Sequence, residues 1–197
     1  EYNESLKKDP ILLNMRRQMF LEQKVADYLL AHKSDYDVTV VMNSELYPFI
    51  SLDMSDIEKA REYSSSFKKI GMSTQSDFHG YTNGFYLGDA ESVAFALSGY
   101  NDIDFLLTID DARIGYEKQL YFWMKKVGVD RIKTSMHFCK MRASKCFMWQ
   151  GHGNDAFSGQ TEKNLKVIFQ EARLLQKSGF GLSWKAHGAN VDAGVAI

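Results

Sequence analysis

The chain has 197 residues, of which 45% are hydrophobic, and it carries 24 lysines and arginines against 25 aspartates and glutamates. That length and composition predict one compact domain with a hydrophobic core. The balanced charge provides no field that would attract a nucleic-acid backbone, so no nucleic-acid partner is expected.

Three further features concern the compartment and the ends of the chain. No stretch approaches the roughly 18 uninterrupted apolar residues of a bilayer span, so no membrane span is expected. Cys139 and Cys146 are the only cysteines, which is too few for a disulfide framework and typical of a reducing compartment. We therefore expect a cytoplasmic location. The chain begins without methionine and ends in the small apolar run 193–197, which favours a piece of a longer protein.

Residues 1–36 are expected to form a helical lead-in that packs on a single α/β catalytic domain at 37–197. Pro10 can open a helix, and apolar residues at helical spacing continue to about His32. The β-branched and apolar run 37–42 predicts the first strand. It ends at Asn43 and Ser44, polar residues that could bind a ligand.

A second helix and a polar loop follow this strand. Asp53 or Ser55 can cap a helix over residues 57–69, with Gly71 as its breaker, and a weaker strand is expected at about 70–73. Residues 76–84 combine polar, aromatic and glycine residues, which is typical of a functional loop. Asp77 and His79 in this loop could bind a base or a ribose. The alternative is a turn with a solvated aspartate.

The central feature is the segment 105–115, where an apolar run ends in Asp110 and Asp111. Helices are predicted before it, at 89–97, and after it, at 116–127. The run therefore predicts a buried strand that delivers two carboxylates to its carboxyl end, where open α/β sheets place their chemistry. Adjacent carboxylates repel each other, and a divalent cation would hold them together. The alternative is that either acid caps the following helix.

The last third of the chain adds a strand at 131–141, a helix at 160–177 and a short strand at 180–184. Arg142 and Lys145 would suit a diphosphate, because guanidinium and ammonium groups offset its charge. Asp155 lies in a glycine-bearing loop with Trp149, His152 and Asn154, a composition that suits a sugar ring. Glu162 could act as a base, although the helix macrodipole alone explains an acid in a first turn.

His187 follows the last strand and could supply a further metal ligand, or it could be an ordinary surface histidine. The alternation of strands and helices predicts a three-layer α/β sandwich with a central, mostly parallel, Rossmann-like sheet.

The pattern resembles the nucleotide-sugar glycosyltransferases of the GT-A fold, including those of phages and large DNA viruses. The resemblance is carried by residues 106–112, the helix 89–97, residues 161–180, and His187 with Gly188. Ala112 stands where the second aspartate of the Asp-x-Asp motif belongs, so Asp111 would substitute for it.

This resemblance implies a metal-dependent transfer of a sugar from a nucleoside-diphosphate sugar donor to a hydroxyl of a glycan or glycoprotein acceptor. Asp110, Asp111 and His187 would hold Mn²⁺ or Mg²⁺ against the diphosphate. In the same scheme Asn43, Ser44, Asp77 and His79 would hold the nucleoside, Arg142 and Lys145 the diphosphate, and Asp155 or Glu162 would be the base.

Two other classes fit the same segment. PIN-type nucleases and Toprim domains also end a strand in Asp-x-Asp, but a PIN-type domain needs another acid at the end of the first strand, where Met42 or Asn43 stands. The third class is a non-catalytic α/β binding module in which the acid pair only caps a helix.

Overall fold

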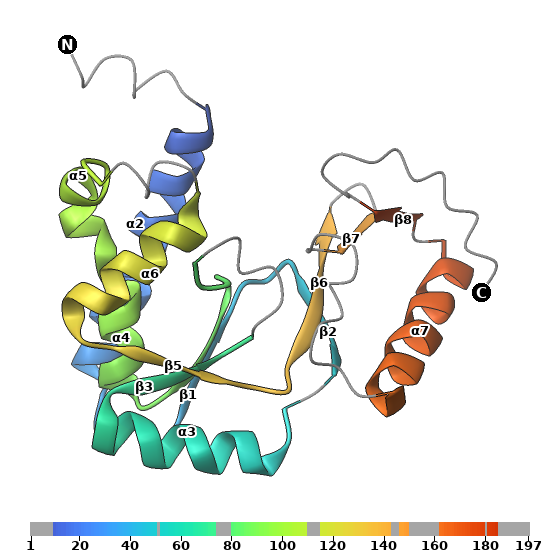
Figure 1. Cartoon of the computed structure of the whole chain (residues 1–197), viewed down its shortest axis with the longest axis horizontal. Helices are drawn as coiled ribbons and strands as arrows, with labels where there is room; N and C mark the ends of the chain where they lie inside the picture. The colour runs from blue at the N-terminus through green and yellow to red at the C-terminus, as the bar shows by residue number, and fades with distance from the viewer. Residues whose placement is uncertain are drawn as a thin grey trace.

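The computed structural model describes residues 10–50, 52–73, 80–109, 115–142, 146–149, 162–179 and 181–184. They form a mixed α/β structure (Figure 1). The helices are α2 Pro10–Ala31, α3 Met54–Phe67, α4 Ala90–Leu97, α5 Ile103–Leu106, α6 Tyr116–Val127 and α7 Glu162–Lys177, with a 3-10 turn η1 at Gly99–Asp102. The strands are β1 Thr39–Met42, β2 Leu46–Ile50, β3 Lys69–Met72, β4 Phe85–Gly88, β5 Asp130–Lys133, β6 His137–Arg142, β7 Cys146–Trp149 and β8 Gly181–Trp184.

The first sheet has the strand order β1-β4-β3-β5 and lies between helices. Figure 1 shows α2, α4 and α6 grouped together, with α3 lying apart from them. Successive residues of a strand point to opposite faces of the sheet, so β4 packs against helices on both faces. Tyr86 packs with α2, α4 and α6, whereas Phe85 and Leu87 pack with Ala60 of α3.

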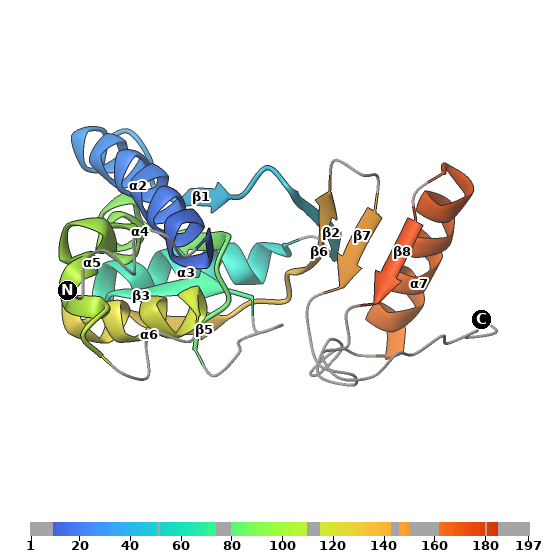
Figure 2. The ribbon, with the colours of Figure 1, turned by 90° about the horizontal axis from the view of Figure 1, so that it is seen from above.

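The second sheet has the order β2-β6-β7-β8 and carries α7 on one face. Phe49 and Cys139 of this sheet pack against Ile168 and Ala172 of α7. The chain passes between the sheets three times, from β1 to β2, from β2 to β3 and from β5 to β6. Figure 2 shows the second sheet with α7 extending away from the first.

Side-chain caps and left-handed residues set the helix ends. Asp53 caps α3 by accepting a hydrogen bond from the backbone N of Asp56 at 2.8 Å. The buried Asp56 in turn accepts a hydrogen bond from the backbone N of Ser135 at 2.9 Å, which ties α3 to the link between β5 and β6. Helix α6 ends at Gly128, whose φ of 71° is the left-handed conformation that glycine adopts without strain.

The prediction of a strand in the central apolar run is wrong. Its first two residues, Phe105 and Leu106, belong to α5, and a turn follows through Ile109. Ile103, Leu106 and Leu107 share one helical face, packed against Met19 of α2. Phe105 is left 50% exposed. The run is apolar along its length, but its packing follows the helical period, and Asp110 and Asp111 lie outside the described residues.

The sheet arrangement also differs from the prediction. Four of the six strand pairings are antiparallel and two are parallel, so the described strands do not form one mostly parallel, Rossmann-like sheet. Strands β2, β4 and β7 were not predicted, the strand predicted at 131–141 is two strands, and Gly71 lies within β3 instead of ending a helix. The other predicted helices and strands of the described residues are confirmed. None of the helices in the described part of the chain is long and apolar enough to cross a bilayer.

Candidate functional site

The most chemically distinctive depression of the described surface is a groove of about 630 Å³ between α2 and the turn that joins β1 to β2. We call it the α2 groove. Its lining combines apolar side chains with amide, hydroxyl, guanidinium and carboxyl groups. The lining residues are Asn14, Arg17, Gln18, Leu21, Glu22, Val25, Val41, Met42, Asn43, Ser44, Glu45 and Tyr86.

A buried carboxyl group lies in the wall of this groove. Glu22 of α2 is 6% exposed. Its Oε1 accepts hydrogen bonds from Nε2 of Gln18 at 3.0 Å and from the hydroxyl of Tyr86 at 3.5 Å. Its Oε2 accepts a hydrogen bond from the hydroxyl of Tyr116. Helices α2 and α6 and strand β4 therefore meet at a single acid.

Burial dominates the acidity of this carboxyl group. Loss of hydration raises the pKa of Glu22 to about 7, although the hydrogen bonds from Tyr116, Gln18 and Tyr86 act in the opposite direction. Burial, together with the charge of Glu22, raises the pKa of Tyr86 and of Tyr116 well above the ordinary value. Both tyrosines therefore stay protonated and donate, while Glu22 exchanges its proton near neutral pH.

The far wall of the groove is a tight turn. The backbone N of Leu46 donates to the carbonyl of Asn43 at 3.0 Å, and the backbone N of Asn43 donates to the carbonyl of Gly84 at 2.8 Å. Gly84 has a φ of 96°, and a Cβ there would lie 2.9 Å from Nδ2 of Asn43. The glycine thus allows the Asn43 amide to pack closely, and the turn presents Asn43 and Ser44 to the groove.

These groups suit proton transfer to a bound molecule. A carboxyl group with a pKa near the working pH exists in both protonation states and can act as acid or base. The tyrosine hydroxyls hold its oxygen atoms in place and stabilise its ionised form. Polar groups on an otherwise apolar lining orient a small ligand.

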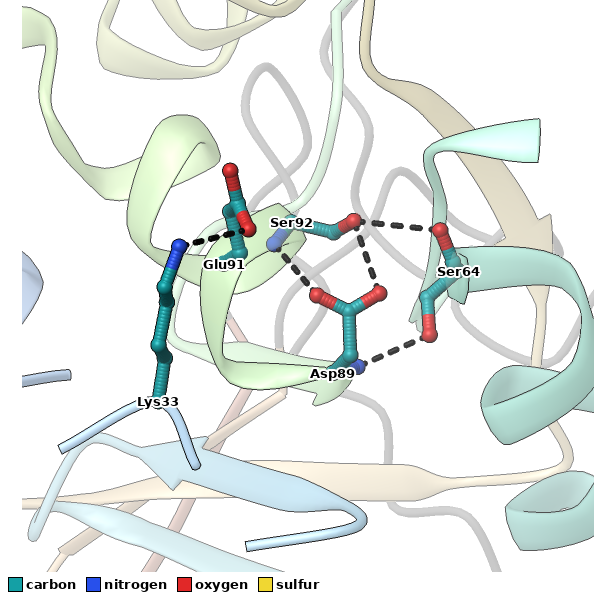
Figure 3. Close-up of polar contacts among 5 residues, drawn as sticks. All are labelled: Lys33, Ser64, Asp89, Glu91 and Ser92. Atoms are coloured by element: carbon teal, nitrogen blue, oxygen red, sulfur yellow. Dashed lines mark hydrogen bonds and ion pairs between the residues drawn. The ribbon is translucent and has the colours of Figure 1, made fainter. Parts of the chain in front are cut away.

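A second depression, of about 520 Å³, lies where the C-terminal part of α3 meets the start of α4. Figure 3 shows Asp89 joined by hydrogen bonds to Ser64 and Ser92, and Lys33 paired separately with Glu91. Asp89 caps α4 by accepting from the backbone N of Ser92 at 2.7 Å, and its own backbone N donates to Oγ of Ser64 at 2.8 Å. Lys33 pairs with Glu91 at 3.3 Å. Because these polar groups form hydrogen bonds and an ion pair with one another, we assign them to helix packing and not to a functional site.

The structure places few of the residues predicted to form the site. Asn43 and Ser44 line the α2 groove, as a ligand-binding role would require. Glu162 is the first residue of α7, exposed, with its Oε1 2.9 Å from Nζ of Lys166, and it does not line the groove. Arg142 ends β6. The other predicted residues lie outside the described residues: Asp77, His79, Asp110, Asp111, Lys145, Asp155 and His187.

The predicted metal site is therefore not placed. Within the described ranges, no group of three or more His, Cys, Asp or Glu residues could hold a metal ion.

Glu22 was missed in the sequence, although a signal for it exists. Met15, Met19, Ala26 and Leu29 are buried along one face of α2, at successive spacings of four, seven and three residues. Glu22 lies three residues after Met19 and four before Ala26, so it occupies the core position that the spacing of seven leaves open. An acid in an apolar stripe must find hydrogen-bond donors or stay protonated, which marks it as a candidate for a shifted pKa.

Comparison with family models, with curated proteins and with solved structures finds no match to this chain.

Proposed function

We propose that the chain is an enzyme that activates a hydroxyl group, of water or of a substrate, by proton transfer to Glu22 in the α2 groove. The observation that carries the proposal is a buried carboxyl group with a pKa of about 7 in the wall of an open groove. Strongly shifted acids in clefts are characteristic of catalytic sites. The reaction class is hydrolysis or transfer to a hydroxyl acceptor.

The chemistry follows from the surroundings of the acid. The ionised carboxylate of Glu22 would take the proton of a hydroxyl bound in the groove, which leaves a stronger nucleophile. Hydrogen bonds from Tyr116 and Gln18 hold the carboxylate in one orientation. Asn43 and Ser44 would orient the substrate from the opposite wall.

The test begins with the acid itself. Carbon-13 NMR of protein labelled at the glutamate carboxyl carbon should show one resonance that titrates near pH 7 and is absent from Glu22→Gln. Hydrolysis of chromogenic p-nitrophenyl esters, phosphates and glycosides should rise through the same pH range and be lost in that variant. Glu62→Gln, on the exposed surface of α3, is the matched control. Titration of Glu22 near its ordinary value of 4.5 would refute the proposal.

A narrower candidate is the metal-dependent sugar transfer that the sequence predicts. The observation that favours it is that Asn43 and Ser44, predicted to hold the nucleoside, line the same groove as Glu22. Glu22 would then accept the proton of the acceptor hydroxyl, in place of Asp155 or Glu162.

Thermal-shift measurements with Mn²⁺ and UDP or GDP test this candidate, because a ligand of the folded state raises stability by mass action. The expected result is a rise in melting temperature that requires both metal and nucleotide and disappears in Asp110→Ala. Metal-dependent cleavage of RNA or DNA without a nucleotide effect would favour a nuclease instead. The absence of both effects would favour a binding module.

A further inference from the structure

Arg17 places an exposed positive charge in the α2 groove. Arg17 is exposed and lines the groove, and it forms no ion pair with any residue that the structure describes. Its neighbour Arg16 instead pairs with Asp104 at 3.1 Å. Among the described lining residues, the other charged ones are Glu22 and Glu45, and Glu45 already has an interaction partner within the chain. Arg17 is therefore the charge that a ligand would meet.

The position of Arg17 on α2 relates it to the acid. Arg17 lies five residues before Glu22, which corresponds to about 7.5 Å along the helix axis at the usual rise. Asn14 and Gln18 lie beside Arg17 and also line the groove. A guanidinium group flanked by amides is a strong site for a planar or tetrahedral oxyanion, because it donates two parallel hydrogen bonds.

The part of the groove around Glu22 would bind an uncharged part of the ligand. Leu21, Val25 and Val41 line the groove with apolar surface, whereas Asn43 and Ser44 offer hydrogen bonds to hydroxyl groups. A small molecule bound in the groove would contact both groups, because Arg17 and Glu22 line the same depression.

We propose that the substrate of the α2 groove is a small hydroxylated molecule that carries an oxyanion, and that Arg17 binds this oxyanion while Glu22 faces a hydroxyl. The inference rests on the proposed function. A phosphate and a carboxylate share the chemistry that Arg17 recognises. The two sources differ in charge and shape, so a binding experiment can separate them.

Isothermal titration calorimetry at pH 6 and constant ionic strength tests the inference with glucose 6-phosphate, glucuronate and uncharged glucose as probes. Glucose 6-phosphate or glucuronate should bind at least tenfold more tightly than glucose, and the tighter of the two identifies the oxyanion. Arg17→Gln should lower the affinity for that probe at least tenfold. Arg17→Lys should give an intermediate loss, because a point charge replaces the bidentate donor.

Lys24→Gln is the matched control. Lys24 is an exposed cation of the same helix and does not line the groove. Its replacement should leave binding unchanged, because the effect is local to the groove and not a result of net charge. Three outcomes would each overturn the inference. The first is an equal loss of affinity in Arg17→Gln and Lys24→Gln, the second is equal affinity for glucose and the anions, and the third is no binding of any anion. If Glu22 still titrates near pH 7 in those cases, only the inference fails and the proposed function stands.

Discussion

At the level of single residues, the surroundings of Glu22 have opposite effects on its pKa. Burial raises the pKa of Glu22, and the hydrogen bond from Tyr116 is the largest influence that lowers it. Tyr116→Phe removes that hydroxyl and leaves the ring in place. The pKa of Glu22 should therefore rise further above 7, as carbon-13 NMR would show. Tyr121→Phe, on the same helix and without a bond to Glu22, should leave the titration unchanged. A lower pKa in Tyr116→Phe would contradict this account.

Cys139 gives a second prediction for a single residue. It is fully buried in β6 against α7, and burial raises the pKa of its thiol to about 12. Because the thiolate is the reactive form, Cys139 should resist alkylation while the protein is folded. Mass spectrometry after iodoacetamide treatment at pH 8, in a Cys146→Ser background, measures this directly. Modification at the rate of a free thiol in native buffer would contradict it, and labelling in 6 M guanidinium chloride is the positive control.

Part of the candidate site could be predicted from the sequence at this scale. Asn43 and Ser44 were identified because polar residues end a β-branched strand, and they do line the groove. The apolar spacing of α2 predicts which face of the helix packs, but it does not predict the hydrogen bonds of Glu22, the acid within that face. Tyr86 and Tyr116 could not be assigned to Glu22 from sequence, since their meeting depends on how β4 and α6 pack against α2.

At the level of elements, the start of α4 depends on a shared set of hydrogen bonds. Asp89 accepts from both the backbone N and Oγ of Ser92, and the Oγ of Ser64 accepts from the backbone N of Asp89 (Figure 3). Asp89→Ala removes the cap and should cost about 1–2 kcal/mol of stability. Urea denaturation measures the loss.

The comparison with Asp53 sharpens this test. Asp53 caps α3 at an exposed position, where water can replace the lost acceptor. Both capping hydrogen bonds are partly buried, but the Asp53 side chain is exposed and that of Asp89 is half-buried. Asp53→Ala should therefore cost less than Asp89→Ala, because water reaches the site of the lost acceptor more easily. Equal losses would show that burial of the α4 cap adds nothing.

Helices were easier to predict than strands for a physical reason. A helix is specified locally, by caps such as Asp53 and Asp89 and by apolar residues three and four apart. A four-residue strand such as β4 has all its residues buried and shows no alternation to detect. The run from Phe105 shows the opposite error, since a continuous apolar stretch suggested a strand although Ile103, Leu106 and Leu107 share a helical face.

At the scale of the whole molecule, strand pairing is the feature that the sequence did not provide. The alternation of helices and strands favoured parallel pairing, but β1 pairs antiparallel with β4, which is distant in sequence. Pairing over such distances depends on which faces the helices cover, and the apolar pattern of each strand alone does not encode it. The position of the α2 groove follows from this pairing, because β4 carries Tyr86 beside β1 and its turn.

The pH dependence of stability is also a property of the whole molecule, because two buried groups act on it in opposite directions. The pKa of Glu22 is raised from 4.5 to about 7, so the folded state keeps a proton that the unfolded state loses, and stability falls as pH rises through that window. Burial lowers the pKa of His137 from 6.5 to about 4, so stability falls as pH drops through that window. Each difference corresponds to about 3 kcal/mol.

The two effects should nearly cancel in the native protein between about pH 4.5 and 6.5, and single variants should expose them. Relative to the native protein, Glu22→Gln should gain about 3 kcal/mol of stability as pH rises from 4.5 to 7. His137→Gln should lose about as much over pH 4 to 6.5, because the native protein then recovers its neutral, buried imidazole. Urea unfolding at half-unit pH steps measures both differences and cancels contributions common to all three proteins. If the difference in unfolding free energy between either variant and the native protein does not change with pH, the corresponding group titrates normally in the folded state.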